Sequence, residues 1–328
     1  MWLMEREIIK VVRYFARFEY PPTELEIYTF ISLRISKVLL KKRLDILIKE
    51  KKLIQGKIKG IFHYGLVGKK NLVDLQEKRE RYSAGKIKKI RLYLQLLSFF
   101  PQIKLVGLSG SMAMMNAEEN DDIDLFVITA KNRLFTGRII ALVLAQLLGL
   151  RRTRDSNKQF FYNEPHPECE QITSGSPRSK KIAFFSSHKD KVCLNLFFDE
   201  INLKVPKFKR SEYVAHEVLQ MKPIIDKDYS YGRFLEANRW VSVLFPNISW
   251  INSKLKTQNS KPQFKNKNFK FLIVIFNFSF LIFNWLGDEI EAWLKIFQLA
   301  FINRHRTREI VTDTQLWFFP EDFEKKMI

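Results

Sequence analysis

Two aspartates separated by one residue stand at the start of an apolar run. Asp122 and Asp124 flank Ile123 and are followed by the apolar residues 125–128. The alternation of acidic and apolar residues predicts a strand, with both carboxylates on one face. Two close carboxylates repel each other, and a bound divalent cation would compensate this repulsion. Because Mg²⁺ prefers hard oxygen ligands, the pair predicts a magnesium site.

A turn precedes the acidic pair. The apolar run 105–108 ends in Ser109, Gly110 and Ser111, and helix-forming residues follow. Gly110 allows the backbone to approach a ligand closely, and Ser111 would begin a helix whose N–H groups attract anions. Taken singly, a Gly-Ser pair is usually a turn and an Asp-x-Asp pattern a solvated strand end. In the order strand, turn, helix, strand, the two patterns predict adjoining phosphate and metal sites.

The spacing of these residues resembles a known signature. Gly110-Ser111, ten further residues and then Asp122-Ile123-Asp124 inside an apolar strand is similar to the pattern of the polymerase-β-like nucleotidyltransferase superfamily. The motif covers residues 110–124, and the similarity in general layout extends over about residues 87–199.

The resemblance implies an α/β (α+β) domain with a small mixed sheet and a Mg²⁺-dependent nucleotidyltransferase activity. Ser109, Gly110 and Ser111 would hold a nucleoside triphosphate, and Asp122 and Asp124 would hold Mg²⁺. A nucleoside monophosphate would pass to an acceptor and pyrophosphate would leave. The acceptor stays open: a protein, an RNA end, or a small molecule such as an aminoglycoside.

A third carboxylate on a later strand usually completes the site in that family. Residues 191–198 predict such a strand with a period of two, but its central polar residue is Asn195. An amide oxygen can bind a metal, but it cannot accept a proton from a nucleophile as a carboxylate can. Three interpretations remain: no base is needed, Asp190 or Asp199 substitutes, or activity is reduced or lost. The last leads to an alternative function, a DNA-binding regulator whose transferase fold senses nucleotide or is inert.

Composition indicates a globular protein of two or three domains. The chain has 328 residues, 46% hydrophobic and 14% aromatic, and a net charge of +21. Residues 1–100 contain 23 Lys and Arg against 10 Asp and Glu, which favours a nucleic-acid partner there, unless the lysines only decorate the surface. The two cysteines, Cys169 and Cys193, have no partners at zinc spacing. The N-terminus lacks a signal-peptide core, so a cytoplasmic location is expected.

Residues 1–70 resemble a winged helix-turn-helix domain. Hydrophobic periodicity predicts helices over residues 5–18, after a Thr23 N-cap, and over about 36–50, followed by a hairpin around Gly56 and Gly60. In such domains the third helix enters the major groove and the hairpin touches the backbone. Phosphate contacts are then expected from the following residues: Lys37, Lys41, Lys42, Arg43, Lys57 and Lys59. A domain used only for protein contacts is the alternative.

The remaining chain is expected to form a nucleotidyltransferase domain over 71–205 and a helical region over 206–328, with a polar linker near 254–270. Within 71–100 we expect an exposed helix, a break at residues 83–85, and a helix that covers the sheet. Residues 211–245 predict two helices separated by a turn over 223–231.

Two further segments leave alternatives open. A basic cluster follows the predicted helix 134–148, and it either neutralises phosphates or forms a solvated loop: Arg151, Arg152, Arg154 and Lys158. Phe271–Leu286 is uncharged and sixteen residues long, which is short for a bilayer span. It predicts either a buried helix or a helix at a membrane surface.

Overall fold

The computed structural model describes residues 2–68, 72–152, 189–248, 287–305 and 309–318. The polar linker near 254–270, Phe271–Leu286, Arg154 and Lys158 lie outside these residues. None of the described helices combines the length and apolar content needed to cross a bilayer.

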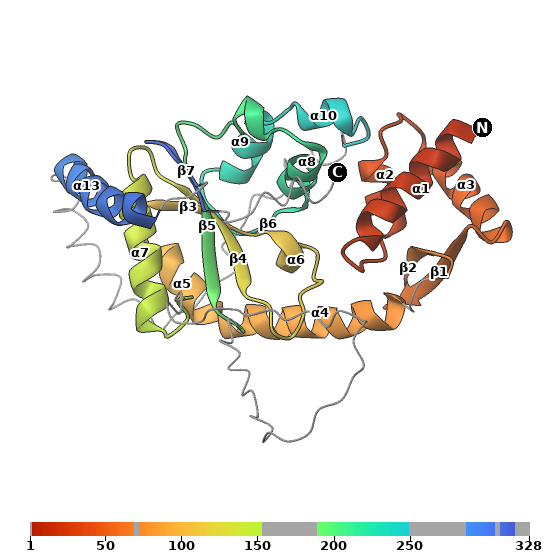
Figure 1. The fold of residues 1–328 in the computed structure, drawn as a ribbon, viewed down its shortest axis with the longest axis horizontal. Coiled ribbons are helices and arrows are strands. Elements are labelled where there is room, and N and C mark those ends of the chain that lie inside the picture. Colours follow the sequence, from red (N-terminus) through yellow and green to blue (C-terminus); the bar gives the residue numbers. More distant parts are fainter. Residues whose placement is uncertain (1, 69–71, 153–188, 249–286, 306–308, 319–328) are drawn as a thin grey trace, which may run out of the picture.

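The architecture is mixed α/β, as predicted, and centres on a six-stranded mixed sheet (Figure 1). The strands of this sheet are β3 (Ile103–Leu108), β4 (Ile123–Thr129), β5 (Val192–Asp199), β6 (Lys222–Asp226), β7 (Ile310–Val311) and β8 (Gln315–Trp317). Their order is β6-β3-β4-β5-β8-β7. The central pair β4 and β5 is parallel and the other neighbouring pairs are antiparallel.

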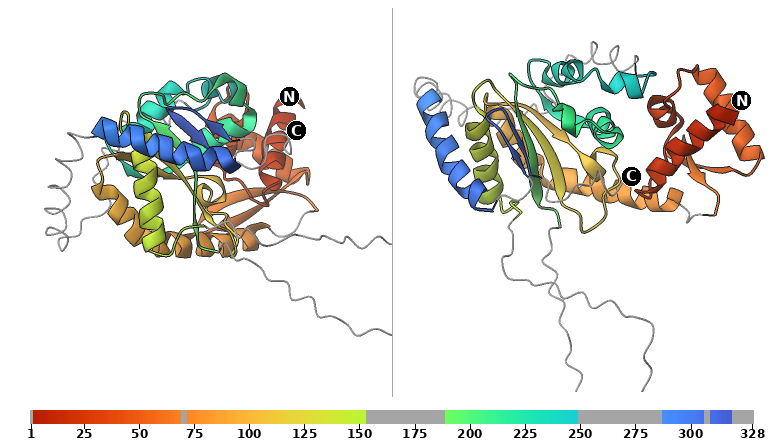
Figure 2. Two further views of the ribbon diagram at one scale, coloured as in Figure 1. Left: turned by 60° about the vertical axis from the view of Figure 1, so that its left-hand side comes forward. Right: turned by 45° about the horizontal axis from the view of Figure 1, so that its top comes forward.

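Helices cover both faces of this sheet. They are α4 (Leu72–Lys89), α5 (Arg91–Phe99), α6 (Gly110–Ala113), α7 (Leu134–Leu147), α8 (Glu212–Gln220), α9 (Ser230–Ala237), α10 (Val241–Leu244) and α13 (Gly287–His305). One core packs β3, β4 and β5 against α5 and α7, and the other packs the opposite face against α8, α9 and α10. Figure 2 shows α7 and α13 on one side of the sheet and α8 and α9 on the other.

The first 66 residues form three helices and a two-stranded hairpin, as the periodicity predicts. The elements are α1 (Trp2–Ala16), α2 (Glu24–Phe30), α3 (Lys37–Lys49), β1 (Leu53–Ile58) and β2 (Ile61–Leu66). Thr23 is the N-cap of α2: its side chain accepts from the Glu26 backbone, and the Glu26 side chain accepts from the Thr23 backbone. Ser36 caps α3 in the same position. We call residues 2–66 the N-terminal unit.

His216 of α8 joins the N-terminal unit to the sheet. Its imidazole is stacked between the rings of Tyr14 and Phe30, with centroid separations of 3.9 and 4.1 Å. Its Nδ1 is buried without a hydrogen-bond partner. Burial, and then the charge of Lys10, lower the pKa of His216 well below its usual value. The neutral ring is therefore the form that this interface accommodates.

We expect His216→Phe to remove part of the acid sensitivity of the fold. The folded pKa of His216 is depressed, so the unfolded chain binds the extra proton, and stability is lost as the pH falls below about 6.5. The wild type should lose about 1.4 kcal/mol per pH unit from this residue, and the variant should not. Urea unfolding at several pH values between 7.5 and 5 measures the difference, and parallel curves for the two proteins would contradict the prediction.

Two expectations about helices are wrong. Helix α4 continues through residues 83–85, where a break was predicted, and it is not an exposed helix, because several of its polar side chains are buried. The segment 223–231 is not only a turn, because β6 pairs with β3 and forms an edge of the sheet. Pro223 is tolerated there because an edge strand needs fewer backbone donors.

The C-terminal region is also less helical than predicted. It contributes β6 at one edge of the sheet and β7 and β8 at the other. Trp317 of β8 is 5% exposed and packs on Phe198 of β5. The central strands β3, β4 and β5 are therefore flanked on both edges by chain that follows residue 205.

Candidate functional site

The turn between β3 and α6 brings Gly110 against Asp124. Gly110 has a φ of +56°, and a Cβ atom added to it would lie 3.2 Å from Asp124 Oδ2. The Ser109 N–H donates to the Asp124 carbonyl at 3.2 Å, which continues the β3–β4 ladder into the turn. The predicted succession of strand, turn, helix and strand is confirmed. The glycine is required here by both the backbone angle and the nearby carboxylate.

An irregularity in β5 directs Asn195 towards the acidic pair. Asp124 is in register with Cys193, but Phe126 is in register with Leu196, so β5 holds one residue more than β4 over this interval. Such a bulge redirects a side chain that strict alternation would place elsewhere. Asn195 Nδ2 donates to Asp124 Oδ1 at 3.0 Å. The prediction of a period of two along this whole strand was therefore wrong.

Asp122, Asp124 and Cys193 form a compact cluster. One potential ligand atom from each lies within 4.8 Å of the other two. The Arg152 guanidinium donates to Asp122 Oδ2 at 2.5 Å and to Cys193 Sγ at 3.3 Å. The Cys193 thiol donates to Asn195 Oδ1 at 2.9 Å. We call these five residues the acidic cluster. Arg152 was one of the basic residues expected either to face the site or to lie in a solvated loop, and it pairs with Asp122; Cys193 was not predicted as a site residue.

Burial and neighbouring negative charges disfavour the ionised forms of Asp124 and Cys193 in the acidic cluster. Burial, followed by the charges of Asp122 and Glu217, raises the pKa of Asp124 to about 7, although Arg152 opposes the shift. Burial and the two aspartates raise the pKa of Cys193 to about 12, so the thiol keeps its proton. The guanidinium of Arg152 compensates part of the negative charge. An added cation would stabilise the charged form of Asp124 further.

The predicted phosphate turn has its donors engaged by carboxylates. The Gly110 N–H donates to Glu217 Oε2 at 3.1 Å, and the Ser111 hydroxyl lies 3.4 Å from Asp121 Oδ2. The expectation of free N–H groups at the start of a helix is thus wrong for Gly110. Helix α6 is a single turn, and α8 packs over it and inserts Glu217. Ser109 is the N-cap of α6, but its side chain makes no capping bond.

Neither acid proposed to replace Asn195 lies in the acidic cluster. Asp190 forms ion pairs with Lys86 and Lys89. Asp199 lies at the other end of β5, in register with Thr129, and accepts the Ile201 N–H at 3.0 Å. Glu217 of α8 is a further carboxylate near Asp124: its charge raises the pKa of Asp124, and it accepts the Gly110 N–H. The sequence did not predict this contact, because a single Glu in an amphipathic helix is common and carries no motif.

One face of α4 holds the loop that leads to Asp122. Its polar residues follow helical spacing and are all buried: Gln76, Arg79, Ser83 and Lys86. Gln76 donates to the Met115 carbonyl at 3.2 Å, and Ser83 accepts the Ala117 N–H at 3.0 Å. Residues 115–121 are therefore fixed by side chains rather than by a regular ladder. This role explains why α4 is continuous and its polar face buried.

Lys86 and Arg79 make the strongest of these contacts. Lys86 Nζ donates to the carbonyls of Glu119 at 2.9 Å and Asp121 at 2.7 Å. Arg79 donates to the Phe18 carbonyl at 3.1 Å and pairs with Glu19 and Glu118. The same helix thus connects the N-terminal unit with the loop before Asp122.

The basic residues predicted to touch nucleic acid differ in availability. Lys37, Lys41 and Lys42 lie exposed on α3. Arg43 is near Glu5 at 3.8 Å, and Lys59 pairs with Glu80 at 2.7 Å. Lys57 lies over the Phe62 ring at 5.5 Å. Exposed charge is therefore carried by α3 and by Lys57 and Lys59 of the hairpin, although Lys59 is paired with Glu80, and Arg43 is the least exposed of the six residues.

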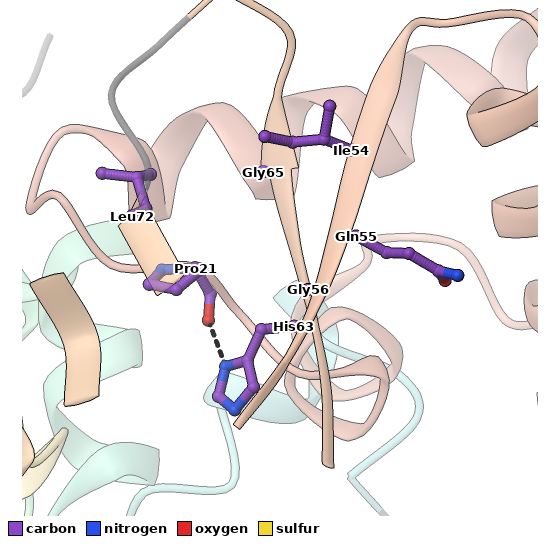
Figure 3. Close-up of a pocket in the computed structure, with 7 residues that line it drawn as sticks. All are labelled: Pro21, Ile54, Gln55, Gly56, His63, Gly65 and Leu72. Carbon is purple, nitrogen blue, oxygen red and sulfur yellow. Dashed lines mark hydrogen bonds between the residues drawn. The ribbon is translucent and has the colours of Figure 1, made fainter. Parts of the chain in front are cut away.

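A cavity of about 280 Å³ lies at the hairpin, away from the acidic cluster. Figure 3 shows its lining, which comes from β1, β2, Pro21 and Leu72 of α4. The polar ring of His63 is already hydrogen-bonded through Nδ1 to the Pro21 carbonyl at 2.7 Å. The lining offers no cluster of acids or bases, so we assign no chemistry to it.

We expect Gly110→Ala to destabilise the protein more than Gly149→Ala. Both glycines have positive φ values, of +56° and +65°, but only Gly110 has a neighbour, Asp124, within 4 Å of the added Cβ. The left-handed backbone costs about 1–2 kcal/mol in both variants, and displacement of Asp124 adds to the cost in one. Chemical denaturation measures the free energies of unfolding of both variants. Equal losses of stability would show that the Asp124 side chain moves away from the added methyl group without a cost in free energy.

No protein-family model, curated protein or solved structure matches this chain.

Proposed function

We propose that this protein is a Mg²⁺-dependent nucleotidyltransferase that moves a nucleoside monophosphate from a nucleoside triphosphate to an acceptor. The observation that supports it best is the convergence of Asp122 and Asp124, beside the Gly110 turn, within the acidic cluster. The resemblance of residues 110–124 to the polymerase-β-like signature supports the same function. The acceptor, whether protein, RNA end or small molecule, is not specified by the cluster.

The donor set suits a hard cation. Two carboxylates and the amide oxygen of Asn195 are oxygen ligands of the kind that Mg²⁺ takes. The Cys193 thiol suits Mg²⁺ less well than these oxygens, because Mg²⁺ prefers hard oxygen ligands; without a cation, burial and the two aspartates raise the pKa of Cys193 to about 12. A Mg²⁺ ion there would polarise phosphate oxygens and stabilise the charge that develops during in-line displacement.

The surrounding residues have separate tasks in this proposal. Asn195 fixes the orientation of Asp124 through its 3.0 Å hydrogen bond. Arg152, 41% exposed, can pair with a phosphate as it now pairs with Asp122. The Glu217 carboxylate accepts the Gly110 N–H, so a phosphate oxygen that accepted the same N–H would have to displace this carboxylate. Among the described residues, neither Asp190 nor Asp199 takes the place of Asn195, so in this proposal the proton of the acceptor passes to solvent.

The test is nucleotide incorporation by Asp122→Asn/Asp124→Asn. We expect the double variant to lose Mg²⁺-dependent transfer of labelled nucleotide by at least about a thousandfold, because both oxygen ligands lose their charge. Asp121→Asn is the control: its amide oxygen can still accept from Glu118 N and Ser111, and it lies outside the cluster. Transfer that survives in the double variant would remove these aspartates from the chemistry.

A second candidate function is DNA binding through the N-terminal unit, with the cluster sensing nucleotide or inert. The exposed lysines on α3 favour it. In a gel-shift assay, Lys37→Ala/Lys41→Ala should weaken salt-sensitive DNA binding, while Lys88→Ala on α4 should not. Mg²⁺ binding without nucleotide transfer, together with such DNA affinity, would favour this candidate over the enzyme.

A further inference from the structure

Helix α13 presents an apolar stripe on its outer face. Its exposed members and their exposed fractions are Trp293 (74%), Ile296 (64%), Phe297 (57%) and Phe301 (55%). Trp293, Phe297 and Phe301 follow each other at intervals of four residues, so they share one face of the helix. Figures 1 and 2 show α13 at the outer edge of the fold, where it packs on α7.

The inner face of α13 is held by polar contacts. The Glu291 carboxylate accepts the backbone N–H groups of Phe135 and Thr136, at 2.7 and 2.8 Å, at the start of α7. Gln298 donates to the Phe135 carbonyl at 2.9 Å and accepts from Arg138 at 2.6 Å. Leu294 and Leu299 of the same helix pack against the core, while the largest apolar side chains of α13 face outward.

Residue types and charge indicate the kind of partner. Trp and Phe are favoured where a helix lies at a membrane–water interface. The uncharged sequence Phe271–Leu286 ends directly before Gly287, where α13 begins, and residues 254–270 contain six lysines and no acid. Lysines that precede an apolar segment in the sequence favour an anionic leaflet. A second copy of the chain is disfavoured, because each copy carries a net charge of +21.

We propose that the outer face of α13 binds the surface of an anionic lipid bilayer. The helix lies in the plane of the interface, with Trp293 and Phe297 inserted among the lipid headgroups and upper acyl chains. The acidic cluster is on other elements, so this inference stands independently of the proposed enzymatic function.

Vesicle sedimentation of the full chain tests the proposal. We expect binding to vesicles of phosphatidylcholine with phosphatidylglycerol, and at least about tenfold weaker partitioning for Trp293→Glu/Phe297→Glu. The control is Phe208→Glu/Val243→Glu, which changes the charge equally at apolar residues that are 73% and 83% exposed elsewhere. The control should stay within about twofold of the wild type, since its substituted residues lie outside the lipid contact.

A conservative variant supplies a second readout. Quenching of tryptophan fluorescence by brominated phosphatidylglycerol should fall in Trp293→Phe, which keeps the helix apolar. The proposal is overturned if the wild type does not bind anionic vesicles, if both double variants bind alike, or if quenching is unchanged in Trp293→Phe. It is also overturned if light scattering shows a dimer that Trp293→Glu/Phe297→Glu dissociates while vesicle binding is unchanged.

Discussion

Lys86→Met should lower the free energy of unfolding by about 3 kcal/mol. Lys86 is 2% exposed, and its ammonium group donates to two backbone carbonyls and to Asp190. Methionine matches the length of the side chain but offers no donor, so the carbonyls of Glu119 and Asp121 and the Asp190 carboxylate all lose this partner. Because these carbonyls belong to the loop before Asp122, we also expect weaker divalent-cation binding at the acidic cluster.

Lys88→Met is the matched control for this change. Lys88 lies two residues further along α4 and is exposed, so the same substitution should alter stability by no more than about 0.5 kcal/mol. Urea denaturation gives both free energies, and calorimetry with Mg²⁺ or Mn²⁺ gives the binding. If Lys86→Met is as stable as Lys88→Met, the polar face of α4 does not hold the loop as we describe.

Local periodicity was sufficient to predict the central part of the fold. The alternation at Asp122–Ile128 and the turn at Gly110 specify β4, α6 and the end of β3, because each pattern is satisfied by contacts close in sequence. The capping box at Thr23 is equally local. The sequence predicted a close approach of Gly110 to a ligand, which stays a prediction; in the structure Gly110 approaches Asp124 of the chain itself.

The parts of the site that could not be predicted depend on tertiary packing. The bulge in β5 leaves no mark in the alternation around Asn195, because an inserted residue is defined only by the partner strand. The polar residues of α4 resemble a solvated face until the loop 115–121 supplies their partners. Glu217 reaches Gly110 only because α8 packs over α6. In each case the sequence does not reveal which segment of backbone packs against the side chain or strand concerned.

Asn195→Asp should make stability strongly dependent on divalent cations. The substitution replaces the donor that faces Asp124 Oδ1 at 3.0 Å with a carboxylate, next to Asp122. Without a divalent cation we expect a loss of about 2–3 kcal/mol, because the hydrogen bond becomes a repulsion between like charges. With Mg²⁺ in excess the loss should be reversed, since a third carboxylate binds the cation more tightly and ligand binding stabilises the folded state by about 2.7 kcal/mol at a hundredfold excess over Kd.

Asn195→Leu separates the two effects. Leucine also removes the hydrogen bond to Asp124 and takes away the amide oxygen without adding charge, so Mg²⁺ should not reverse its loss of stability relative to the wild type. Thermal unfolding with and without the cation, for the wild type and both variants, measures the response. If Asn195→Asp gains no more from Mg²⁺ than Asn195→Leu does, a third carboxylate at this position does not recruit the ion. If none of the three proteins gains stability from Mg²⁺, the acidic cluster is a charge network neutralised by Arg152 rather than a cation site.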